Sequence, residues 1–283
     1  MKVKNKVKYL EIESIDGLGA IKKACAEQRV FKATTMTIFQ NFVSDLYFPM
    51  LHRFSSEKIF TNFGFDKTGY DVVSLDFLLT KLECLKEQPL DNITKSDRYQ
   101  AFGVLNARRL FNLSTINKAH FPDYRHTLSF LWIGLSTGQM HFDIHNNFLL
   151  QLSGVKEIVI IPPEFNVIRS GKKYLSGYSR WEDDSVLEPC QWLAHIPHYK
   201  TILKPGEYVY IPSGAYHAPL ALSYDSVSLN SFLIPKPFGY QYKSFEKKEE
   251  ASLPYVNLMY SMSKLYYRLF GKPFLRSGPF EIM

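Results

Sequence analysis

The sequence has few cysteines and no long apolar run. Its 283 residues include three cysteines, Cys25, Cys84 and Cys190, which lie far apart and form no Cys-x-x-Cys pair. This sparse, odd set argues against a disulfide framework and a cysteine zinc site, and it favours a reducing compartment. No apolar run reaches the length of a membrane span, and the basic residues 1–8 precede no apolar stretch typical of a secretory signal. We therefore expect a cytoplasmic protein without membrane contact.

Internal repeats and low-complexity segments are also absent from the sequence. The aromatic content of 15%, with 22 Phe and 18 Tyr, is generous and favours a β-rich core. The net charge of +7 comes from 34 basic and 27 acidic residues. This charge can attract acidic partners at low salt, but it does not by itself identify a nucleic-acid-binding protein.

The pattern of apolar residues divides the chain into three parts. Residues 1–125 are expected to form a mixed α/β region that leads into a barrel, with an edge strand at 9–12 and a helix at 75–87. Ser74 would cap that helix, and Phe77, Leu78, Leu79, Leu82 and Leu85 would form its apolar face. A strand is expected at 98–102. Residues 236–283 read as helical.

Residues 126–235 differ from the rest of the chain in their short β-like runs. These runs are separated by Gly, Pro and Ser, and they lie at 128–135, 140–152, 155–161, 208–211 and 227–233. Several short strands at this spacing predict a mainly β sandwich or jelly roll. A long polar and aromatic insert at 164–203 interrupts the β core.

Two stretches carry residues suited to bind a metal. Residues 141–152 alternate polar and apolar side chains as one strand, which would place His141, Asp143, His145 and Asn147 on one face. Residues 203–217 form a turn, a strand and a second turn that leads to His217, on a strand expected to face the first. Two imidazoles and one carboxylate are the ligand set of non-heme iron(II) enzymes, and they leave other coordination positions open.

The order of these motifs resembles the Jumonji-C hydroxylases of the cupin superfamily, and most closely their asparaginyl hydroxylases. The family pattern is Ile-Gly, His-x-Asp, Asn-Phe, Gly-x-Lys and Pro-Pro, followed by Lys-Pro-Gly-Asp, Tyr-Ile-Pro, His and Ser-x-x-x-Asn. The matching residues here are Ile133-Gly134, His141-Phe142-Asp143, Asn147-Phe148, Gly154-Val155-Lys156, Pro162-Pro163, Lys204-Pro205-Gly206-Glu207, Tyr210-Ile211-Pro212, His217 and Ser226 to Asn230. The resemblance spans roughly residues 70–235.

The resemblance implies a double-stranded β-helix, or jelly-roll cupin, with flanking helices on its N- and C-terminal sides. It also implies Fe(II) as cofactor and 2-oxoglutarate as cosubstrate, with His141, Asp143 and His217 as the metal ligands. Lys156 would pair with the distal carboxylate of 2-oxoglutarate, because a dicarboxylate in a partly buried site needs a fixed cation. The further residues near the cosubstrate would be Tyr99, Thr137, Asn147 and Asn230.

The substrate is less constrained than the reaction. A protein or peptide side chain is the leading substrate, and His145, Arg180 and Trp181 are candidates to contact it. One alternative, an RNA nucleoside hydroxylase acting on modified tRNA, is supported only by the net charge. Another is a non-catalytic metal-binding cupin scaffold. The apolar stretch from Tyr255 to Leu269 predicts a homodimer through the C-terminal helices, as in relatives.

Overall fold

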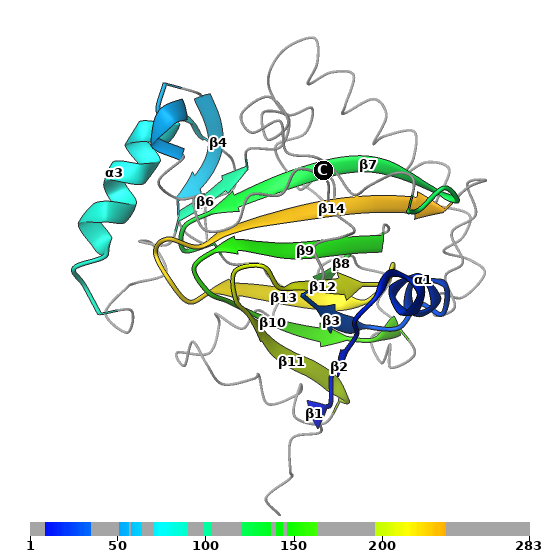
Figure 1. Cartoon of the computed structure of the whole chain (residues 1–283). Coiled ribbons are helices and arrows are strands. Elements are labelled where there is room, and N and C mark those ends of the chain that lie inside the picture. Colours follow the sequence, from blue (N-terminus) through cyan, green and yellow to red (C-terminus); the bar gives the residue numbers. More distant parts are fainter. Residues whose placement is uncertain are drawn as a thin grey trace, which may run out of the picture.

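The structure is a computed structural model, and it describes residues 9–34, 51–56, 58–63, 71–89, 99–102, 120–136, 140–143, 146–163 and 196–235. Within these residues the chain is mainly β, as predicted, with its strands in three sheets (Figure 1). The predicted C-terminal helices and the predicted dimer surface at 236–283 lie outside the described residues. No helix in the described ranges is long and apolar enough to cross a membrane.

Two large sheets form the centre of the molecule. The six-stranded sheet has the order β2-β3-β12-β9-β14-β7, with bounds Glu13–Ser14, Phe31–Ala33, Tyr208–Ile211, Asn146–Ser153, Val227–Pro235 and Tyr124–Ile133. The five-stranded sheet has the order β1-β11-β10-β13-β8, with bounds Tyr9–Leu10, His198–Leu203, Lys156–Ile161, Tyr216–Ala221 and His141–Phe142. The expected strand at 208–211 is confirmed at both ends. The strands β1, β2 and β3 add N-terminal residues to both sheets.

The single strand predicted at 140–152 is two strands in different sheets. β8 ends at Phe142 and pairs with β13 in the five-stranded sheet, whereas β9 begins at Asn146 and pairs with β12 and β14 in the six-stranded sheet. The alternation of polar and apolar residues continues from His141 to His145 and fails only at Asn146, where β9 begins, so the pattern up to that residue does not reveal the change of sheet.

The predicted insert at 164–203 includes a strand at its end. Its last six residues, His198–Leu203, form β11, which pairs with β10 along five residue pairs. The imidazole of His198 is buried, and its Nδ1 lies 2.8 Å from the carbonyl oxygen of Ile196. His198 is therefore part of the sheet, and the structure does not place it in a surface loop.

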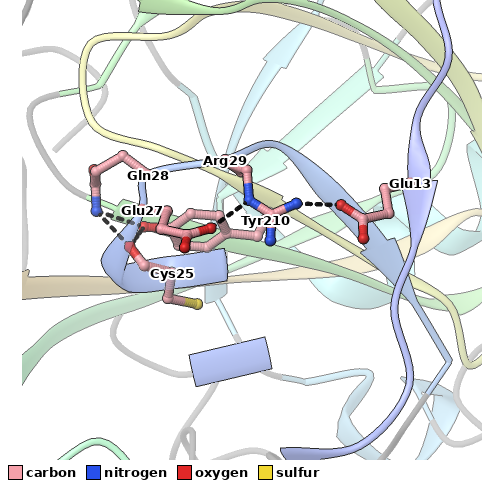
Figure 2. Close-up of polar contacts among 6 residues, drawn as sticks. All are labelled: Glu13, Cys25, Glu27, Gln28, Arg29 and Tyr210. Carbon is pink, nitrogen blue, oxygen red and sulfur yellow. Dashed lines mark hydrogen bonds and ion pairs between the residues drawn. The ribbon is translucent and has the colours of Figure 1, made fainter. Parts of the chain in front are cut away.

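The outer face of the six-stranded sheet is covered by two helices. Buried apolar residues of α1 (Leu18–Ala26) and α3 (Leu75–Leu85) belong to the same core cluster as Phe148, Leu150, Tyr208 and Tyr210 of the sheet. The C-terminal end of α1 is held by Gln28, whose Nε2 donates to the carbonyl oxygen of Cys25 at 2.8 Å and to the hydroxyl of Tyr210 at 3.0 Å (Figure 2). Arg29 follows, paired with Glu27 and Glu13.

The predicted start of the helix at 75–87 is confirmed by α3, whereas the prediction that Phe77 lies on its buried apolar face is wrong. The hydroxyl of Ser74 accepts a hydrogen bond from the backbone N–H of Phe77 at 3.2 Å, so it caps α3. The helix ends at Leu85, two residues earlier than predicted. Phe77 is 43% exposed and packs under the ammonium of Lys81, because it lies beside the buried Leu stripe rather than within it.

A smaller sheet lies beside the six-stranded sheet. Its order is β5-β4-β6, with bounds Asp71–Ser74, Lys58–Phe63 and Tyr99–Phe102. β6 runs close to β7, the edge strand of the six-stranded sheet (Figure 1). The predicted strand at 98–102 is thus confirmed as β6, and it brings the backbone of Tyr99 near the edge of the main sheets.

The two large sheets pack face to face. A buried cluster joins Leu149 and Val209 of the six-stranded sheet to Ile158 and Ile160 of the five-stranded sheet. Side chains alternate across a strand, so residues that share the face of Leu149 also point between the sheets. We call this the inner face, and it carries most of the polar residues discussed next.

Candidate metal centre and cosubstrate site

His217 and Asp143 lie together at one end of the inner face. His217 is the second residue of β13, and Asp143 directly follows β8 on the neighbouring strand of the same sheet, not on a facing strand as predicted. Their closest atoms, His217 Nε2 and Asp143 Oδ2, are 3.4 Å apart. The backbone N–H of Gly214 donates to the carbonyl oxygen of Asp143 at 2.8 Å, which fixes the turn before His217 against the aspartate.

The orientation of the His217 ring fits a metal ligand. Its Nδ1 is 3.0 Å from the carbonyl oxygen of Ala215, which can only accept, so Nδ1 carries the proton. In the neutral imidazole the lone pair is then at Nε2, directed toward a carboxylate oxygen. Two acceptor atoms at this distance need either a proton or a cation between them. A divalent metal bound by both would satisfy them, and histidine ligands commonly have such a second hydrogen bond to a carbonyl.

For His141, the third predicted ligand, the structure describes the position of the backbone only. His141 is the register partner of His217 in the antiparallel pair of β8 and β13. Its side chain lies outside the described residues. Among the described side chains, no group of three His, Cys, Asp or Glu residues could hold a metal ion.

The side-chain amine of Lys156 has no acidic partner among the described residues. It begins β10 and is 1% exposed. Its Nζ donates to the hydroxyl of Ser136 at 3.2 Å and to the hydroxyl of Ser228. Burial lowers the pKa of the Lys156 ammonium from 10.5 to about 7. A buried lysine bound only by hydroxyls is a site that an anion would complete.

The serines that contact Lys156 were not among the predicted site residues. Ser228 lies on β14, two residues before Asn230, and Ser136 follows the end of β7. Both are buried, at 0% and 3% exposed. Alternation along β14 could have identified Ser228, because it shares a face with Asn230. The predicted cosubstrate residue in this stretch is Thr137, the neighbour of Ser136, and Thr137 lies outside the described residues.

The side chains of two predicted residues, Asn147 and Asn230, lie on the inner face of the six-stranded sheet. Asn147 shares the face of Leu149, and its register partner on β12 is Ile211 of the inner cluster. Asn230 is the register partner of Leu149 itself. In the described part of the chain, both amide atoms of Asn147 and the Oδ1 atom of Asn230 are buried without a hydrogen-bond partner. A bound polar ligand is the partner such atoms need.

The turn before Lys156 depends on a glycine, as the motif predicted. Gly154 has φ +63°, and a Cβ there would lie 2.2 Å from the hydroxyl of Ser223 and 2.8 Å from the Cα of Ser226. Only glycine combines this backbone conformation with so close an approach. The turn connects β9 of one sheet to β10 of the other and so fixes where Lys156 enters the barrel.

The remaining predicted residues are only partly described. The backbone of Tyr99 pairs with Phe63 in the small sheet, and its side chain is not described. His145, Arg180 and Trp181, predicted to contact substrate, lie outside the described residues.

A comparison with known families identifies the chain. The sequence profile described as "Cupin-like domain" matches residues 93–236, which are 144 of the 283 residues. The chain belongs to the cupin-like domain family. This family is of the Jumonji-C type. In this cupin-like chain the match runs from before β6 to the end of β14 and includes every predicted ligand and cosubstrate residue. No curated protein matches the sequence.

Proposed function

We propose that this cupin-like protein is an Fe(II)- and 2-oxoglutarate-dependent oxygenase that hydroxylates a protein or peptide side chain. The observation that carries the proposal is the pairing of His217 with Asp143, at 3.4 Å, on the same inner face as the buried Lys156. A metal-ligand pair and a buried lysine amine, which can pair with a carboxylate once it is protonated, are the two parts that a metal-chelating dicarboxylate requires.

The strand order supports a double-stranded β-helix as the detailed fold. From β7 to β14, the strands of one sheet are β7, β14, β9 and β12, and those of the other are β8, β13, β10 and β11. The chain therefore passes between the sheets as it winds, which is the path of a jelly roll. On this path β9, β10 and β13 would all border the space between the two sheets, with the starts of β10 and β13 at opposite ends of their antiparallel pair.

In the proposed site, His141, Asp143 and His217 would hold Fe(II). The strand register that pairs His141 with His217 supports including His141 in the set. When bound, the metal and 2-oxoglutarate would support an oxidation by O2, in which one oxygen atom enters a substrate C–H bond and the other enters succinate as CO2 is released.

Each remaining residue of the proposed site has a role of its own. Lys156 would bind the distal carboxylate of 2-oxoglutarate, and Ser136 and Ser228 would orient the Lys156 amine. Asn147 and Asn230 would offer their free amide atoms to the cosubstrate. The buried apolar residues between the sheets would exclude water.

The substrate class rests on the resemblance to asparaginyl hydroxylases, of which the hydroxylase of hypoxia-inducible factor is the most similar in its motifs. Hydroxylation of a modified tRNA nucleoside is the second candidate, favoured by the net charge of +7. Binding to tRNA would weaken steeply with added salt, because each released counterion contributes to the affinity.

The test combines a coproduct assay with mass spectrometry. The purified protein is mixed with Fe(II), 2-oxoglutarate and candidate proteins, peptides or tRNA, and succinate is measured together with a gain of one oxygen in the candidate. We expect succinate from the parent protein and none from His217→Ala. His52→Ala serves as the matched control, because His52 is exposed and far from the proposed site in sequence. Iron binding without succinate for any candidate would favour the non-catalytic scaffold.

A further inference from the structure

The amine of Lys156 is an unusual cation for a carboxylate site. It is fully buried, and its two partners are hydroxyls, on Ser136 and Ser228. No carboxylate in the described part of the chain contacts it. A charged ammonium in this position lacks a counter-ion, and burying an unpaired charge is costly.

The charged and titratable groups around Lys156 do not compensate it. On β10, the acidic neighbour Glu157 points to the opposite face and pairs with Lys200 at 3.1 Å. The register partners of Lys156 are Leu203 on β11 and Ala221 on β13, both apolar. Among the described side chains of this sheet, the titratable ones on the inner face are Tyr199, four residues before Leu203, and His217, four residues before Ala221, with Asp143 beside it.

The two serines suit both protonation states of the amine. A hydroxyl accepts a hydrogen bond from an ammonium, and it donates one to the lone pair of a neutral amine. Burial also lowers the pKa of Lys156 to about 7, so that near pH 8 most molecules of the ligand-free protein hold a neutral amine. An incoming carboxylate reverses this preference, because a nearby negative charge favours the ammonium.

We propose that binding of a dicarboxylate at Lys156 is coupled to the uptake of one proton from solvent by its amine. This inference rests on the proposed function, which makes 2-oxoglutarate the dicarboxylate. The neutral amine, held between Ser136 and Ser228, becomes an ammonium that pairs with the distal carboxylate. The site thus avoids an uncompensated buried charge when empty and gains a full ion pair when filled. Cosubstrate affinity then depends on pH even though 2-oxoglutarate itself keeps its charge.

The test is calorimetric titration of the whole protein with 2-oxoglutarate. The protein is loaded beforehand with Mn(II), which replaces iron and prevents turnover, so that the metal ligands have already released their protons. Titrations at each pH are repeated in buffers with different enthalpies of ionisation, and the dependence of the heat on the buffer gives the number of protons taken up. We expect uptake to rise from near zero at pH 6 to near one at pH 8.5. The Kd should increase about tenfold for each pH unit above this transition.

Lys156→Arg provides the matched control, because its guanidinium stays charged at every pH used. If this variant binds, its binding should take up no proton and should vary little with pH. The parent protein alone decides the inference, whether or not the variant folds. Binding of 2-oxoglutarate with no proton uptake at pH 8.5 would overturn the inference and leave the proposed function standing. Absence of binding at every pH would overturn the proposed function and the inference together.

Discussion

The two faces of the six-stranded sheet differ sharply although they belong to the same strands. The outer face is apolar and aromatic: Phe148 contacts Phe121, Tyr208 and Tyr210, with ring centroids 5.0–5.8 Å apart. Two helices complete this core. The inner face of the same strands carries Asn147, Asn230 and Ser228, all buried, and both asparagines have polar atoms without hydrogen-bond partners in the described part of the chain.

This difference separates the parts of the molecule that stabilise it from the parts that bind. The outer face follows the rule that buried surfaces are apolar and closely packed. The inner face departs from that rule at Asn147, Asn230 and Ser228, the last of which contacts Lys156. Unpartnered polar groups cost stability, so departures of this kind are expected where a ligand supplies the missing partner.

The largest effect on stability should come from the outer face. Phe148→Ala removes a fully buried ring from the centre of the aromatic cluster. We expect the free energy of unfolding to fall by about 3–5 kcal/mol, through lost burial and the cavity left behind. Chemical denaturation followed by circular dichroism measures this loss. A change below about 1 kcal/mol would show that the outer face does not form the core.

On the inner face, Lys156→Met should separate stability from binding. Replacing a buried amine by an apolar chain of similar length should raise the free energy of unfolding near pH 7 by on the order of a few kcal/mol. The same change should weaken 2-oxoglutarate binding by about a hundredfold, because the distal carboxylate loses its cation. Denaturation and calorimetric titration of both proteins measure the two effects.

The pH dependence of that stability difference has a defined sign. The unfolded chain keeps the lysine proton up to about pH 10.5, whereas the folded chain keeps it only up to about pH 7. The unfolded state therefore binds more protons between these values, and the stability of the parent protein rises with pH there. The advantage of Lys156→Met should be largest at or below pH 7 and should vanish near pH 10.5. An advantage that grows with pH would contradict the assignment.

Substitutions in the turn that leads from β9 to Lys156 should cause a smaller loss of stability than Phe148→Ala. Gly154 and Gly206 both have positive φ, at +63° and +85°, but only Gly154 lies against other atoms. Gly206→Ala should cost roughly 1 kcal/mol, the cost of the backbone conformation alone. Gly154→Ala should cost roughly 2–3 kcal/mol, because its Cβ also meets Ser223 and the backbone of Ser226. Equal losses would show that the turn adjusts without strain.

Much of this arrangement could be predicted from local sequence signals, and the exceptions share a physical cause. The strand at 208–211, the cap at Ser74 and the glycine turn before Lys156 each depend on a few neighbouring residues. The break between β8 and β9 depends on which sheet each strand joins, and the alternation from His141 to His145 is the same in either case. Ser136 and Ser228 meet at Lys156 only because β10, β14 and the end of β7 converge. Such long-range contacts leave no periodic signal.

The smallest and most specific test uses two adjacent asparagines that begin β9. The Oδ1 atom of Asn146 accepts a hydrogen bond from the backbone N–H of Ser213 at 2.9 Å, whereas Asn147 has no partner for either amide atom in the described part of the chain. Asn146→Ala should cost about 1–2 kcal/mol of unfolding free energy, because the hydrogen bond from the backbone N–H of Ser213 is lost. Asn147→Ala should change that free energy by less than about 1 kcal/mol, since no hydrogen bond is lost.

For cosubstrate affinity we expect the reverse ranking: Asn147→Ala should have the larger effect and Asn146→Ala the smaller. If Asn147 contacts 2-oxoglutarate, its replacement by Ala should weaken binding by about tenfold, the loss expected for one hydrogen bond. Asn146→Ala should leave the Kd nearly unchanged once the protein is folded. Calorimetric titration with Mn(II)-loaded protein measures both values. If Asn147→Ala destabilised the fold as much as Asn146→Ala and left binding unchanged, the inner face would be structural at this position, and its contrast with the outer face would not mark a binding site.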